Sequence, residues 1–250
     1  MSASKSVFLF VLLITLPQLS QAGWQDFTDS IKQKINERIE KNSKSALSEE
    51  AIADALKQAL YQGIKESVKQ LKTKNGFLAD ASVRIPMPQG LTKVEKALRK
   101  IGQKKVADDF VATMNEAAEQ SVAKTVTILV DAVKNMTLTD AVKILNGEQN
   151  AATMYFRTNS ESKLRDLIKP IVTQTTQSVG LTRHYKKLTK ASSSLQKYMD
   201  KDSLDLDEYI TRKAIDGLFV KIADEENRIR NNPLSRRTNL LKDVFGSLDK

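Results

Sequence analysis

Apolar residues recur at every third or fourth position along most of this chain, the spacing that places them on one face of an α-helix. The clearest run lies between Ser48, a good helix N-cap, and the turn-forming pair Asn75-Gly76. Its apolar positions are Ile52, Leu56, Leu60, Ile64, Val68 and Leu71. Because each such face has to be buried against another element, the sequence predicts an all-α protein.

Further helices are expected wherever this spacing continues between turn signals. The expected ranges are 91–101, 106–136, 141–145 capped by Thr137 or Thr139, 150–157, a helix from 159 or 160 kinked at Pro170, 181–199, 206–230 capped by Asp205, and 238–245. The alanine-rich 106–136 helix should lie centrally, because small side chains let neighbouring helices approach closely. Residues 77–85 alternate like a short extended segment. We therefore expect one multi-helix bundle over residues 23–250, with at most one extended segment near 77–85.

The amino terminus has the features of a cleavable signal peptide. Lys5 gives a short positive region, residues 7–16 are apolar, and small residues precede the expected cleavage site after Ala22. A retained membrane anchor is the alternative, but Pro17 interrupts the apolar run well short of the ~20 residues that a span needs. We expect residues 1–22 to be removed, the mature protein to lie in the periplasm or otherwise outside the cytoplasm, and no transmembrane span in the mature chain.

Residues 23–45 carry a narrow apolar stripe on an otherwise charged stretch. Phe27, Ile31, Ile35 and Ile39 recur every fourth position, which predicts an amphipathic helix. Such a helix either packs its stripe on the body of the protein or forms a peripheral arm for a membrane surface or a partner. Both interpretations are left open by the sequence.

The chain is basic, with 40 lysines and arginines against 30 acids. Its positive field favours anionic partners such as lipid headgroups, although a basic surface can also serve solubility alone. Candidate contacts with an anionic ligand are Arg84, Lys93, Arg99 and Lys187, in two basic stretches. Nucleic acid is not an expected partner, because few aromatic residues interleave with these cations and the chain is expected to be exported.

Cysteine is absent and histidine occurs once, as His184, which removes many familiar sites. Without cysteine there are no disulfides, thiolate nucleophiles or thiol-bound metals, and one histidine cannot build the common zinc hydrolase sites. The acidic run over 200–208 lacks the glycine of a calcium loop, and Asp205 is better explained as a helix cap. We expect no metal and no cofactor.

Two polar groups on predicted helices are candidate ligand-binding sites. Asn115 and Glu119 lie four residues apart and share a helix face, where they either converge on a ligand or satisfy each other in the core. Glu225 and Glu226 precede Arg228 and Arg230, a pattern that suits an acid–base pair or an anion clamp. It suits an ion-pair network equally, because Glu226 and Arg230 have the spacing of a helical salt bridge.

Several short sequence motifs, taken in their order along the chain, together resemble those of a known protein family. The motifs are Gly76-Phe77, Val83-Arg-Ile-Pro86, Met114-Asn-Glu-Ala-Ala-Glu119, Ala151-Ala-Thr-Met-Tyr-Phe156, Leu206-Asp-Glu-Tyr209, Lys213-Ala-Ile-Asp-Gly-Leu-Phe219 and Asn232-Pro233. With these, nearly all of the mature chain resembles domain of unknown function family 4197, which comprises bacterial exported proteins. The resemblance implies an exported helical protein and transfers no catalytic residue. One departure is Glu116, where the family motif has arginine.

The function that this sequence favours is non-enzymatic binding of an apolar or anionic component of the cell envelope. One alternative is a hydrolase or lyase that uses Glu119, Glu225 or Glu226 as its acid or base. Another is a structural or assembly protein that acts through helix contacts.

Overall fold

The computed structural model describes residues 49–178, 180–191, 205–232, 235 and 242, all within one compact unit. The expected signal peptide over 1–22 and the amphipathic stretch over 23–45 lie outside the described residues. Most of the expected helix at 238–245 also lies outside them.

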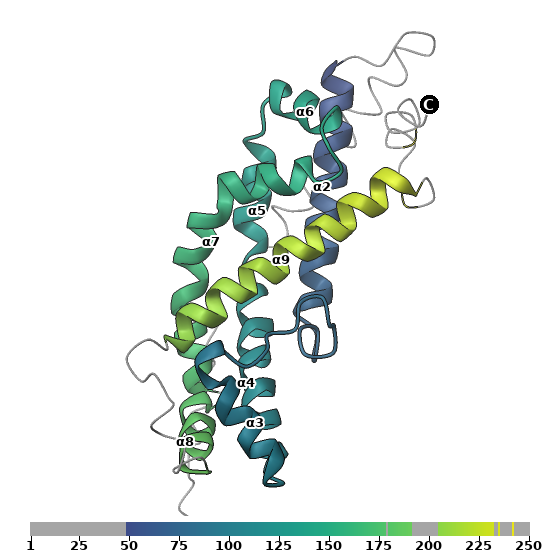
Figure 1. Cartoon of the computed structure of the whole chain (residues 1–250). Coiled ribbons are helices and arrows are strands. Elements are labelled where there is room, and N and C mark those ends of the chain that lie inside the picture. Colours follow the sequence, from purple (N-terminus) through teal and green to yellow (C-terminus); the bar gives the residue numbers. More distant parts are fainter. Residues whose placement is uncertain (1–48, 179, 192–204, 233–234, 236–241, 243–250) are drawn as a thin grey trace, which may run out of the picture. The chain divides into compact units, whose positions relative to one another are not determined.

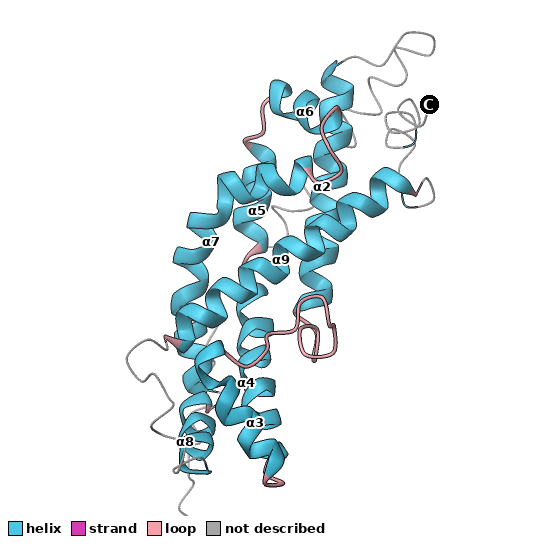
Figure 2. Ribbon diagram, in the orientation of Figure 1, coloured by secondary structure: helices cyan, strands magenta, loops and turns pink. Residues whose placement is uncertain are grey.

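Helices joined by turns make up the described residues, which contain no β-strand (Figure 2). The elements are α2 (Glu49–Leu71), the short 3-10 helix η1 (Gln89–Leu91), α3 (Thr92–Lys100), α4 (Lys104–Val122), α5 (Val126–Lys134), α6 (Leu138–Leu145), α7 (Ala151–Ser178), α8 (Leu181–Ala191) and α9 (Leu206–Asn231). The predicted all-α class is confirmed. The predicted cap Asp205 is confirmed as well, since its carboxylate accepts the Glu208 N–H at 2.9 Å.

The core lies where α9 crosses α7 and α2, with α4 packed against α7 and α9 (Figure 1). Phe77, Phe110 and Phe156 are fully buried. Gly217 in α9 permits one of these contacts, because a Cβ at that position would lie 2.7 Å from the Phe77 ring. The absence of a side chain at Gly217 therefore lets the segment after α2 pack directly on α9.

The single helix expected over 106–136 is wrong, because the structure divides it into α4 and α5. The chain turns at residues 123–125, where the buried Thr125 hydroxyl donates to the Val122 carbonyl at 2.8 Å. This hydrogen bond satisfies a carbonyl at the end of α4. After the turn, α5 packs against α2 and α7. In contrast, the expected helices at 150–157 and from 160 onward join into α7, which continues through Pro170.

No strand forms in the segment 77–85, which was the one expected to be extended. Residues 74–83 form consecutive turns, and burial alternates from Val83 through Ile85 to Met87. This short extended stretch has no neighbouring strand among the described residues, and its backbone groups bond to a side chain of α4 instead. A lone extended segment satisfied in this way needs no sheet.

Candidate functional site

Asn115 is fully buried in α4 and holds the backbone of Ile85. Its carboxamide oxygen accepts the Ile85 N–H at 2.8 Å, and its amide nitrogen donates to the Ile85 carbonyl at 2.9 Å. The same nitrogen donates to the Val111 carbonyl of its own helix at 2.7 Å. The side chain therefore supplies the two hydrogen bonds that a neighbouring strand would give, and its polar atoms are directed at the protein itself.

Glu119 lies one turn further along α4 and holds the start of the same segment. Its two carboxylate oxygens accept the N–H groups of Asn75 at 3.1 Å and Phe77 at 3.2 Å. Burial raises the pKa of the Glu119 carboxyl, while the backbone N–H donors act in the opposite direction. Asn115 and Glu119 share a helix face, as predicted, and there they bind the backbone of residues 75–85.

A third contact fixes this segment from α9. Lys221 forms an ion pair with Asp80 at 2.6 Å, and this hydrogen bond, with help from Ser82, lowers the pKa of Asp80 to about 2. The segment between α2 and η1 is thus held by polar side chains from two different helices.

Glu226 and Arg230 in α9 join the end of α6 to the start of α7. Glu226 accepts the N–H groups of Ala152 at 3.0 Å and Thr153 at 2.9 Å, at the first turn of α7. Arg230 donates to the Ile144 carbonyl at 2.7 Å, at the last turn of α6, and to Glu226 at 3.0 Å. The Glu226 carboxylate lies at the positive end of the α7 helix dipole, and the Arg230 guanidinium lies at the negative end of the α6 dipole. Each charge is therefore stabilised where it lies.

Glu225 is also engaged by the protein. It is paired with Arg228, whose Nε donates to it at 3.0 Å, and it accepts from the Gln70 amide at 3.3 Å. The hollow beside Glu225 has a volume of only about 10 Å³, which suits a single water molecule. Glu119, Glu225 and Glu226 therefore bond to backbone, arginine or amide groups in three separate places.

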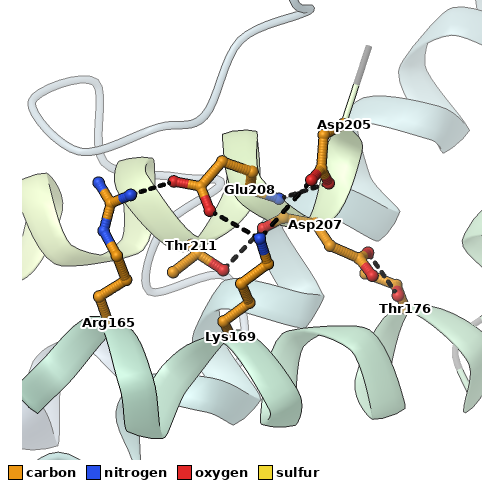
Figure 3. Close-up of polar contacts among 7 residues, drawn as sticks. All are labelled: Arg165, Lys169, Thr176, Asp205, Asp207, Glu208 and Thr211. Atoms are coloured by element: carbon orange, nitrogen blue, oxygen red, sulfur yellow. Dashed lines mark hydrogen bonds and ion pairs between the residues drawn. The ribbon is translucent and has the colours of Figure 1, made fainter. Parts of the chain in front are cut away.

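A polar cluster between α7 and α9 was not anticipated from the sequence (Figure 3). Lys169 in α7 contacts Glu208 at 3.0 Å and Asp205 at 3.6 Å, and Arg165 contacts Glu208 at 2.6 Å. The hydrogen bond to Glu208 raises the pKa of Lys169. The end of the acidic run thus pairs with cations from another helix, and within the described residues no three metal-ligating side chains gather around a common point.

The most concentrated charge lies on a surface that we call the basic platform, formed by residues 92–109 and 181–187. It comprises α3, the first turns of α4 and most of α8, which lie at the same end of the described unit in Figure 1. Arg99 of α3 contacts Asp108 at 2.8 Å, and the Tyr185 ring of α8 lies 6.2 Å from the Phe110 ring. Because Asp108 and Phe110 are about 200° apart around α4, α3 and α8 flank its first half from opposite sides.

The basic platform contains nine lysines and arginines against three acids, a formal charge of +6 in a chain whose total is +10. Five of these cations are exposed and form no ion pair with a carboxylate among the described residues. They are Lys96, Lys100, Lys104, Arg183 and Lys187. Arg99 is paired with Glu95 and Asp108, and Lys105 with Asp109. The platform therefore has a large unneutralised positive charge facing solvent.

The structure brings three of the four predicted anion contacts onto this platform. Lys93 and Arg99 lie on α3, and Lys187 lies on α8. Arg84 is exposed on the segment that precedes η1, outside the platform. His184 is half-buried on α8 beside Tyr185.

Ile101, at the tip of the platform, is a feature that the sequence analysis missed. Its side chain is 64% exposed, and among the described residues only Met154, at 52%, joins it as an exposed large apolar side chain. From the sequence, position 101 was expected only as the last residue of a short helix over 91–101. A usable signal was present, because Gly102 ends the helix immediately afterwards and lysines stand on both sides.

A second surface feature is an open groove along α5, α6 and α7. Two adjoining hollows of about 270 and 290 Å³ share Asp140, Tyr155 and Asn159 in their walls. Burial, and then the charge of Asp140, raises the pKa of Tyr155. The groove is lined by both acidic and basic side chains, so its charge is not concentrated in one sign.

None of the described helices has the length and apolar content of a membrane span.

A family model described as a protein of unknown function, DUF4197, matches residues 46–246, which confirms the resemblance found in the sequence. No curated protein and no solved structure matches the chain.

Proposed function

We propose that this chain, which belongs to the DUF4197 family of proteins of unknown function, binds an anionic surface of the cell envelope through its basic platform. The observation that carries this proposal is the clustering of +6 formal charge on α3, the start of α4 and α8. The binding is non-enzymatic, and the signal peptide over residues 1–22 delivers the protein to the envelope.

The arrangement of the platform's cations supports binding more than it supports stability. Lys96, Lys100 and Lys104 contact no carboxylate among the residues that the structure describes, so they contribute no salt bridge to this part of the fold. Each lysine close to an anionic membrane surface contributes about 1 kcal/mol to binding. Several such residues on one end of the molecule give a useful affinity without a deep pocket.

A hydrolase or lyase would use the carboxylates of Glu119, Glu225 and Glu226. Their positions favour binding over catalysis. Glu119 and Glu226 each accept two backbone N–H groups, and Glu225 is paired with Arg228. A catalytic carboxylate needs access to a substrate proton. These three instead hold segments of the chain in place.

A pair of lysines at the tip of the platform tests the proposal. Replacing Lys100 and Lys104 together with glutamine should weaken binding to vesicles that contain anionic phospholipid by about 2 kcal/mol, or roughly 30-fold. Cosedimentation of the purified protein with vesicles at low salt measures this change. Both side chains are exposed, so the fold should be unaffected.

Lys72 and Lys74, after the end of α2, provide the matched control. They are exposed, close together in sequence and outside the platform, and their replacement by glutamine changes the net charge equally. This control pair should retain most of the binding. Equal losses from the two pairs would show that total charge, and not the platform, governs binding, and the proposal would then be wrong.

A further inference from the structure

We infer that Ile101 inserts into the apolar part of a lipid bilayer, so that the anionic partner of the platform is a membrane. This inference rests on the proposed function and names its partner. A soluble polyanion offers nothing to an exposed isoleucine, whereas the acyl region of a bilayer buries it.

The turn between α3 and α4 is held by backbone hydrogen bonds and does not need the Ile101 side chain for its stability. The Gln103 N–H donates to the Leu98 carbonyl at 2.8 Å, and the Gly102 N–H donates to the Arg99 carbonyl at 3.4 Å. Gly102 has a φ of +79°, which glycine adopts without strain. These are the backbone bonds of a Schellman helix end, whose usual apolar contact involves the positions of Leu98 and Gln103. The fold therefore does not require an apolar residue at position 101.

The surroundings of Ile101 suit contact with a flat anionic surface. A Cβ built at Gly102 would meet no atom within 4 Å, so the tip is open. Lys100, Lys104 and Lys105 are exposed around it. Their ammonium groups match phospholipid headgroups, and their alkyl stems can lie along the apolar boundary. Charge complementarity and one exposed apolar side chain thus occur at the same point.

Met154 shows that exposure alone does not make such a site. It lies on α7 in the wall of the groove, whose lining includes one charge of each sign, Asp140 and Lys143. Figure 1 places the start of α7 and α6 away from α3 and α8. Met154 is therefore a matched position with similar exposure and without the concentrated positive charge.

The natural absence of cysteine allows a direct test of insertion. The variant I101C, labelled with an environment-sensitive fluorophore, should shift its emission to shorter wavelength when anionic vesicles are added. Lipids with brominated acyl chains should quench the label. The variant M154C, labelled in the same way, should show neither effect. An unshifted, unquenched label on vesicle-bound I101C would overturn the insertion of Ile101 and leave the platform's anion binding standing.

A second variant separates a membrane from a soluble polyanion. I101S should lower partition onto anionic vesicles about tenfold, because the inserted side chain is lost, and leave retention on heparin unchanged. An equal effect on both ligands, or binding to heparin with none to vesicles, would contradict the membrane as partner. If the proposed function itself were wrong, the result would differ, because the unmodified protein would bind neither anionic vesicles nor heparin.

Discussion

Replacing Glu226 with alanine should lower the free energy of unfolding by about 3–5 kcal/mol, because it breaks the ion pair between the buried Glu226 carboxylate and the largely buried Arg230. The Glu226 side chain is 4% exposed and that of Arg230 is 12% exposed. The substitution also leaves the N–H groups of Ala152 and Thr153 without their acceptor at the first turn of α7. The connection between α6 and α7 should therefore loosen first. Urea denaturation followed by circular dichroism measures the change.

The pair formed by Arg157 and Glu161 is the matched control for this experiment. It has the same i,i+4 relation within one helix, but its side chains are 37% and 42% exposed and its closest N–O distance is 3.7 Å. Replacing Glu161 with alanine should therefore cost at most about 0.5 kcal/mol. If both substitutions cost the same small amount, Glu226 does not join α6 and α7 in the way we describe.

Replacing Asn115 with leucine should destabilise the protein by about 3 kcal/mol, because the side chain of similar size removes the carboxamide but fills the space. The N–H and carbonyl of Ile85, itself fully buried, would lose their partners. Each buried polar group left unsatisfied costs about 1–3 kcal/mol. The same denaturation measurement, together with faster proteolysis between residues 75 and 88, should report this loss.

Asn159 offers the same substitution at an exposed position of α7. Its amide donates only to the Tyr155 carbonyl of its own helix, at 2.8 Å. Changing Asn159 to leucine should be almost neutral, since leucine is the better helix former and the carbonyl keeps its helical bond. A near-neutral result for Asn115 as well would contradict the role of its carboxamide in holding Ile85.

The parts of the fold that the sequence predicted are those set by local chemistry. The helix caps act within three residues. The structure confirms Asp205 and, of the two expected alternatives Thr137 and Thr139, shows Thr137 as the cap, in a reciprocal capping box with Asp140. The break between α4 and α5 was not predictable in this way. Apolar positions continue through Val122, Val126 and Leu129 as in one helix, and α5 diverges because it packs on α2 and α7.

The candidate site shows the same division between local and distant causes. The spacing of Asn115 and Glu119 predicted a shared face, but their backbone partners lie 30 or more residues away. The basic stretches around Arg99 and Lys187 were visible in the sequence. Their convergence on the first half of α4 depends on tertiary packing, which no local pattern contains.

The salt dependence of vesicle binding tests the central claim most directly, that the basic platform binds an anionic envelope surface. Binding of the unmodified protein to anionic vesicles should fall steeply as salt rises, because the Debye length shrinks from ~10 Å at 0.1 M to ~3 Å at 1 M. The variant without Lys100 and Lys104 should show a shallower dependence. Vesicles of neutral lipid should retain little protein at any salt concentration. Equal binding to neutral and anionic vesicles, unaffected by salt, would contradict the claim.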